Sequence, residues 1–352
     1  MTRKDPHRFG RRLQNVARLA KRFRYAPLAV LASATAASAH VRWFTDADEA
    51  HAAGFPTYAI TDLPVLIWLA IGIVLVSIAV ALDGRLPVVP IVNSKLRHDA
   101  MELMRILTGM SLLLTAYGGE LIAPHMSAYG TLGYSLVFVQ AAIGILLISN
   151  HFIHIAAIMM VVLLVGTMAQ FGFVQGFEYV NIIGIALFLF FNHVPNQALR
   201  DRLKPYSVDV LRIFTGIALV TLGVTEKLTG AILGQSFVAS YEWNFMPMLG
   251  FDWYTDQLFV LSAGAMEVVF GVIMVLGVIT RLNTFVIAAF MLASNIVFLL
   301  TNENENALME LVGHMPIIAT ALILLLLGYG QRLKLANPTL RQDKRGSAVP
   351  AE

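Results

Sequence analysis

Nine long apolar stretches dominate the chain, separated by polar segments of varied length. They cover residues 63–82, 104–123, 132–149, 152–173, 179–193, 209–228, 257–277, 283–301 and 309–328. Most are close to the ~20 residues that a helix needs to cross the hydrocarbon layer of a bilayer. Helices of soluble proteins are shorter and alternate apolar with polar faces. The pattern predicts an all-α polytopic membrane protein with about nine spans after a signal peptide.

Composition agrees with a membrane protein and removes several kinds of chemistry. Hydrophobic residues make up 57% of the chain and charged residues 13%, whereas a soluble domain has roughly 25% charged residues. Cysteine is absent, which excludes disulfides and thiolate metal sites. Redox or metal chemistry would therefore use His, carboxylate or Met side chains, or a bound cofactor. No motif favours nucleotide or nucleic-acid binding.

The first 39 residues resemble a secretory leader. A basic region is followed by a short apolar stretch over residues 26–32 and by Ala37-Ser38-Ala39, the small-residue pattern that signal peptidases cleave. The apolar stretch is too short to span a bilayer. Cleavage after Ala39 would make His40 the mature N-terminus. The alternative is an uncleaved signal anchor.

The charges between the stretches predict the topology. Lys and Arg concentrate in alternate loops and in the C-terminal tail, whereas the other loops carry mainly Asp and Glu. Because basic loops remain in the cytoplasm, we expect the mature N-terminus outside and the C-terminus in the cytoplasm, in a bacterial inner membrane.

An internal repeat divides the apolar region. Residues 105–109 read R-I-L-T-G and residues 212–216 read R-I-F-T-G. Gln140 and Glu267 then fall at matching positions, and Glu178 matches Glu310. Four spans each would make the units parallel, related by an axis along the membrane normal.

The repeat predicts six segments along the chain. They are a basic leader and signal peptide (1–39), an outer N-terminal segment (40–62), a leading span and inner loop (63–97), a first four-helix unit (98–204), a second four-helix unit (205–335) and a cytoplasmic tail (336–352).

The second unit resembles the DoxX family of small four-helix bacterial membrane proteins. The resemblance rests on Arg212-Ile213-Phe214-Thr215-Gly216, on Glu226-Lys227, on Glu267 followed by Gly271, and on Thr280-Arg281. The first unit resembles the family more weakly. Since the family includes a subunit of an archaeal thiosulfate:quinone oxidoreductase, the resemblance implies a component of a respiratory or redox system. It also implies quinone as a ligand and a redox protein as a partner.

Ionisable residues within the apolar stretches are the candidate site, because a charge in hydrocarbon costs several kcal/mol. We expect a ligand-binding cluster in the outer half of the second unit, formed by Glu226, Lys227, Glu267, Asn295, Glu310 and His314. Such a cluster could bind a proton, a cation or the carbonyl oxygens of a quinone. The alternative is a structural role, with Glu226–Lys227 and Glu267–Arg281 as ion pairs that lock helices.

Two further hypotheses stay open. The outer N-terminal segment offers His40 and His51, and copper favours such nitrogen ligands; this predicts a metal- or solute-handling membrane protein. The alternative for this segment is a polar leader with Trp43 and Phe44 anchored at the membrane interface. The last hypothesis is a non-catalytic membrane scaffold.

Overall fold

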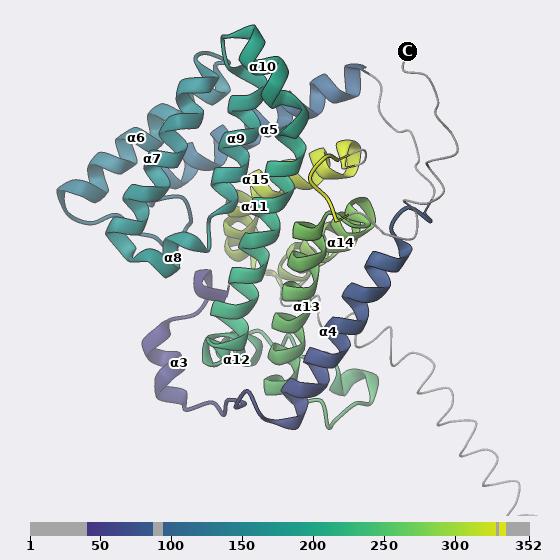
Figure 1. Cartoon of the computed structure of the whole chain (residues 1–352). Coiled ribbons are helices and arrows are strands. Elements are labelled where there is room, and N and C mark those ends of the chain that lie inside the picture. Colours follow the sequence, from purple (N-terminus) through teal and green to yellow (C-terminus); the bar gives the residue numbers. More distant parts are fainter. Residues whose placement is uncertain (1–40, 87–93, 329–330, 336–352) are drawn as a thin grey trace, which may run out of the picture.

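The computed structural model describes residues 41–86, 94–328 and 331–335 (Figure 1). Every named regular element in that part of the chain is a helix, which confirms the predicted all-α class. The predicted leader, His40 and residues 336–352 lie outside the described residues, so cleavage after Ala39 stays a prediction.

The chain enters the described region through a short segment at one end of the bundle. The 3₁₀ turn η1 (Val41–Trp43) leads to α3 (Ala47–Ala53). The Asp46 side chain accepts hydrogen bonds from the backbone of Asp48 and Glu49, which caps α3. The long apolar helix α4 (Leu63–Leu82) follows and packs outside the bundle against α13.

After α4, which is the first apolar stretch, the other eight stretches lie wholly or largely on helices that form two successive sets. The first set is α5 (Ser94–Tyr117), α6 (Gly130–Ile148), α7 (Ile153–Phe171), short α8 (Phe173–Phe177) and α9 (Asn181–His193). After α10 (Gln197–Leu203) and η2 (Lys204–Tyr206), the second set is α11 (Ser207–Leu222), η3 (Gly223–Leu228), α12 (Ala231–Ser240), η4 (Pro247–Leu249), α13 (Asp256–Leu276), α14 (Thr280–Leu300) and α15 (Asn304–Leu327).

Seven helices in the described ranges are long and apolar enough to cross a membrane. Two of the nine expected spans fall outside this group. Helix α5 begins with a run of charged residues, and α9 has 13 residues. Large apolar side chains such as Leu69, Phe138 and Leu292 are exposed on the outer helix faces, as lipid contact requires.

The stretch predicted at 104–123 ends as a helix at Tyr117. Gly119 adopts a positive φ of 75°, which ends the helix because that conformation favours glycine. The chain then folds back through a loop, where Leu121 and Ala123 are buried in the bundle. These residues are apolar because they fill the core, and not because they continue a span.

Eight helices form a closed ring. Going round it, each helix packs on the next in the order α5, α6, α7, α9, α11, α13, α14, α15 and again α5. The ring closes through the contacts of α9 with α11 and of α15 with α5. The two predicted units therefore pack together along both sides and enclose a shared centre.

The same contacts recur in both units. The Arg105 guanidinium donates to the Leu147 carbonyl and, at 2.6 Å, to the Ile148 carbonyl; that of Arg212 donates to Met274 and, at 2.7 Å, to Val275. Arg105, in the middle of α5, is thus joined to the end of α6, and Arg212, in the first half of α11, to the end of α13.

Glycine pairs bring the same helices close together. A Cβ placed on Gly144 would stand 2.9 Å from the Gly109 carbonyl oxygen, and one on Gly271 would stand 2.6 Å from that of Gly216. Because such distances exclude any side chain, these glycines set the helix spacing in both units.

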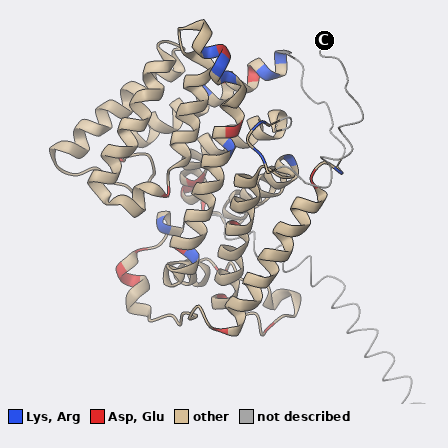
Figure 2. Cartoon of the chain, in the orientation of Figure 1, with Lys and Arg blue, Asp and Glu red and all other residues tan. Residues whose placement is uncertain are grey.

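Charge is distributed unevenly between the two ends of the bundle. Figure 2 shows Lys and Arg gathered at the end that carries α10, and Asp and Glu near α3 at the opposite end. We refer to these as the α10 end and the α3 end.

Candidate functional site

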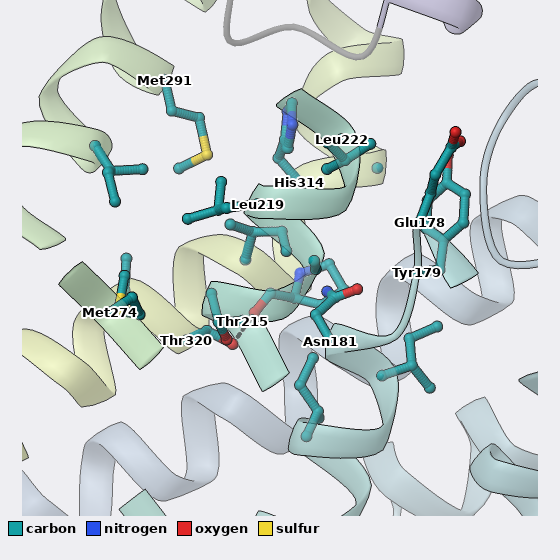
Figure 3. Close-up of a pocket in the computed structure, with 18 of the residues that line it drawn as sticks. Glu178, Tyr179, Asn181, Thr215, Leu219, Leu222, Met274, Met291, His314 and Thr320 are labelled. Atoms are coloured by element: carbon teal, nitrogen blue, oxygen red, sulfur yellow. Dashed lines mark hydrogen bonds between the residues drawn. The ribbon is translucent and has the colours of Figure 1, made fainter. Parts of the chain in front are cut away.

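A cavity lies at the centre of the helix ring (Figure 3). Side chains from α5, α7, α9, α11, α13, α14 and α15 line it. Its volume of about 120 Å³ is roughly ten times the space that one buried water needs. Its walls are largely apolar and include Leu219, Leu222, Met274 and Met291. This combination of depth and apolar lining is typical of small-molecule sites.

Polar groups line the cavity at several points. Thr215 from α11, Thr320 from α15 and Asn181 from α9 are labelled in Figure 3. The Thr215 and Thr320 hydroxyls each donate to the carbonyl four residues earlier in their own helix. Their oxygen lone pairs can still accept a hydrogen bond from a ligand.

Two members of the predicted cluster form a buried ion pair beside the cavity. Lys227 Nζ lies 2.8 Å from Glu267 Oε1, and both residues line the cavity. Lys227 sits in η3, a π-helical turn that continues α11. Such turns alter the direction of side chains within a helix and are common at functional sites. Here η3 buries the neighbours Glu226 and Lys227 together.

This pairing corrects the expected alternative of Glu226–Lys227 and Glu267–Arg281 pairs. Lys227 is bonded to Glu267, and Arg281 donates to the backbone carbonyl of Leu326. The reason is geometric: η3 packs directly on α13, whereas Arg281 lies at the start of the next helix.

Glu310 and His314 lie on one face of α15, as their spacing predicted. His314 Nδ1 lies 3.9 Å from Glu310 Oε1, and the Ser294 hydroxyl donates to that same oxygen at 2.6 Å. His314 lines the cavity, whereas Glu310 is buried but is not one of the lining residues. Asn295 is not brought to the cavity. Its amide donates to the Ala307 carbonyl at 3.0 Å and joins α14 to α15.

The residues that sequence reasoning missed come from the N-terminal segment. Trp43 Nε1 donates to the Tyr179 hydroxyl at 3.0 Å, and the Trp43 ring lies 5.0 Å from the His314 ring. Trp43 is 7% exposed, so it is buried in the bundle, contrary to an interfacial anchor. Gly313 makes room for it, since a Cβ there would stand 2.2 Å from the indole ring.

Glu178 also belongs to this site. It lies between α8 and α9, is buried, and accepts a hydrogen bond at 2.7 Å from the Thr225 hydroxyl. Its match to Glu310 in the repeat was the available signal.

The structure describes only one of the two proposed metal ligands. His40 lies outside the described residues. His51 is exposed on α3, and its ring Nδ1 lies 2.6 Å from the Ala47 carbonyl oxygen of its own helix. Among the residues that the structure describes, no group of three or more His, Cys, Asp or Glu side chains could hold a metal ion.

A comparison with known proteins found a match for the part of the chain that holds some of these site residues. No match was found among the curated proteins or among the solved structures. One family model matches, from the start of α11 to the end of α14. The match includes Glu226, Lys227 and Glu267, whereas Glu178, Glu310 and His314 lie outside it. Residues 207–300 of this chain match the DoxX family model, as predicted from the sequence of the second unit.

Proposed function

We propose that this protein is an integral membrane component of a respiratory or redox system, and that it binds a quinone in the central cavity. The observation that carries the proposal is an apolar cavity inside a membrane bundle with a buried ion pair on its wall. A redox partner protein would supply or accept the electrons.

The cavity suits the chemistry of a quinone head group. Such a ring is flat and apolar on its faces and has two carbonyl oxygens that accept hydrogen bonds. Met274 and Met291 offer soft, adaptable contacts for the ring. Lys227 offers an ammonium donor beside Glu267, and Asn181 offers an amide at another part of the wall.

The charge distribution supports an orientation for this site. We propose that the basic α10 end faces the cytoplasm of a bacterial inner membrane, by the positive-inside rule. The α3 end, with η3 and the N-terminal segment, would then lie on the outer side. A ligand dissolved in the lipid would reach the cavity from within the bilayer.

Tryptophan fluorescence provides the test, because quinones quench excited indole rings at short range. Trp43 touches His314, which lines the cavity, so we expect saturable quenching of the detergent-solubilised protein by decylubiquinone. Trp43→Phe should remove most of that quenching. Decane, which shares the tail but lacks the ring, should give none.

A cavity-filling substitution separates the cavity from general detergent effects. Ala218 lines the cavity, and Ala218→Phe should weaken quinone binding at least tenfold. Leu292→Phe, at an exposed position on α14, is the matched control and should leave the affinity unchanged. Quenching that does not saturate, or that Ala218→Phe leaves intact, would exclude the cavity as a quinone site.

A non-catalytic scaffold is the second candidate, favoured by the mutual neutralisation of Lys227 and Glu267 at 2.8 Å. For a scaffold, neutralising both groups together would leave assembly with a partner unchanged. The Lys227→Met/Glu267→Gln double variant tests this by co-purification. Loss of quinone binding with assembly intact would favour the redox proposal.

A further inference from the structure

One buried amide on the cavity wall has no hydrogen-bond partner among the residues that the structure describes. Asn181, the first residue of α9, lines the cavity and is 7% exposed. Its side chain is drawn at the cavity in Figure 3. Buried polar groups in native proteins nearly always have a partner, so an amide left without one calls for a physical explanation.

Comparable asparagines of the bundle use their amides to join helices. The amide of Asn283 on α14 donates to the Phe270 carbonyl of α13 at 3.0 Å. That of Asn295 donates to the Ala307 carbonyl of α15, also at 3.0 Å. Asn181 makes no such contact, so holding two helices together does not account for this amide.

Packing contacts locate Asn181 along the cavity. A Cβ on Gly184 would stand 2.7 Å from the Cβ of Phe214, so α9 and the antiparallel helix α11 are level at this point (Figure 1). Asn181 lies three residues earlier in α9, which brings it close to the level of Thr215. Figure 3 shows Asn181, Thr215 and Thr320 at the same end of the cavity.

The Lys227–Glu267 pair lies farther toward the α3 end. A Cβ on Gly223 would stand 3.1 Å from the Glu267 Cβ, so this carboxylate is level with Gly223. Eight residues separate Thr215 from Gly223, which at ~1.5 Å per residue is roughly 12 Å along the helix axis. The cavity therefore offers an ion pair at one level and neutral polar groups at another, with the apolar Leu219 between them.

We propose that Asn181 binds the second carbonyl oxygen of a para-quinone whose first carbonyl oxygen lies at Lys227. This inference rests on the proposed function and narrows its class of ligand. Two hydrogen bonds of ~2.9 Å, with a six-membered ring between them, span a length of the required order. A ring with one carbonyl, or with two adjacent carbonyls, leaves one of the two levels without a bond.

The same groups suit the reduced ligand. An amide carries both N–H donors and a carbonyl acceptor, so Asn181 can accept from the hydroxyl of a quinol after donating to the carbonyl of a quinone. At the other level Lys227 donates and Glu267 accepts. The arrangement therefore binds a para-quinone and its quinol in one orientation.

Matched variants provide the first test. Asn181→Leu keeps the size of the side chain and removes the amide, and it should weaken decylubiquinone binding roughly fivefold, as loss of one neutral hydrogen bond does. The thermal midpoint should not fall, because the amide has no partner in the described protein. Asn192→Leu makes the same change on α9 at an amide that donates to the Phe188 carbonyl and does not line the cavity, so affinity should stay unchanged. Equal affinities in Asn181→Leu and the wild type would overturn the proposal.

A ligand with one carbonyl separates the hydrogen bond from a change of cavity shape. 2-Decyl-1-tetralone keeps the fused rings and the tail of 2-decyl-1,4-naphthoquinone but has one carbonyl, and both can be measured by displacement of decylubiquinone. The naphthoquinone should bind the wild type roughly fivefold more tightly than the tetralone, and the two should bind Asn181→Leu equally. A loss shared by both ligands would overturn the proposal. If Asn181→Leu does not fold, equal affinities of the wild type for the two ligands would overturn it.

Infrared spectra of bound quinone, labelled with ¹³C at one carbonyl, report each oxygen separately. Both carbonyl bands should lie below their positions in detergent alone, because hydrogen bonds weaken the C=O stretch. Asn181→Leu should return one band to its unbound position and leave the other in place. A variant in which both bands move, or neither does, would contradict the assignment of one carbonyl to Asn181. A wild type that binds no quinone saturably would instead refute the proposed function itself, and this inference with it.

Discussion

The two predicted four-helix units place different side chains at the same point of a shared scaffold. Gln140 on α6 and Glu267 on α13 precede matching glycines and matching arginine-bound carbonyls. Gln140 receives a hydrogen bond at 2.8 Å from the Ile122 backbone, and its amide donates at 2.8 Å to the Thr115 hydroxyl. Glu267 instead pairs with Lys227 beside the cavity.

This difference separates structural from chemical roles within the repeat. The neutral amide of Gln140 forms hydrogen bonds with buried backbone groups and fixes the 118–129 loop. These side-chain bonds replace the backbone hydrogen bonds that a helix or strand would provide. The Lys227–Glu267 pair occupies the corresponding place, but it lines the cavity. A buried ion pair is by itself weak evidence for a stabilising role. Ligand binding is therefore the role that we assign to this pair as a hypothesis.

The largest effect should come from breaking the ion pair. Lys227→Met removes the partner that lies 2.8 Å from the Glu267 carboxylate, and we expect a loss of ~3–5 kcal/mol in unfolding free energy. Chemical denaturation in detergent would measure it. The Lys227→Met/Glu267→Gln double variant should recover most of the loss, because it leaves no buried charge at the pair. A single-variant loss below ~1 kcal/mol would mean that the pair is solvated.

A smaller effect is expected at the matching position of the first unit. Gln140→Leu leaves the Ile122 N–H and the Leu112 and Glu120 carbonyls without this partner, which should cost ~1–3 kcal/mol. Because Gln140 does not line the cavity, quinone affinity should stay unchanged. Ser135→Ala, at an exposed position on α6, is the control for stability. A change in ligand affinity in Gln140→Leu would end the division of roles between the units.

Much of the scaffold could be predicted because it follows from local sequence. Apolar length locates the helices. The recurring R-I-x-T-G motif identified Arg105 and Arg212, whose contacts prove equivalent. The ion pair between Lys227 and Glu267 could also have been predicted, since both are ionisable residues in apolar stretches.

The rest of the site depends on contacts between distant parts of the chain. The bond from Val41 to Glu226 joins residues 185 positions apart, and no local pattern predicts that an N-terminal segment enters the bundle. Trp43 and Phe44 are typical of an interfacial belt in sequence alone. Trp43 is buried because Gly313 leaves space for its ring, and Phe44 is partly buried because it packs in the aromatic cluster around Phe298.

The smallest expected effect concerns Glu120, which stands at the same interval after Arg105 as Lys227 does after Arg212. Glu120 borders a depression that Leu308 and Glu305 also line, and burial raises its pKa to about 7 from 4.5. The folded protein therefore holds this proton more tightly than the unfolded chain does. Stability from this group is highest below about pH 4.5, falls between about 4.5 and 7, and is constant above.

Thermal midpoints across that pH range provide the test. Glu120→Gln should remove the decline, while Glu305→Gln, which lines the same depression from α15, should retain it. The change should stay below ~1 kcal/mol, because solvent screens a partly exposed carboxylate. A decline that persists in Glu120→Gln would assign the pH dependence to other groups. A flat profile in Glu120→Gln would instead show that the first unit places an isolated acid, sensitive to pH, where the second unit places the lysine of its ion pair.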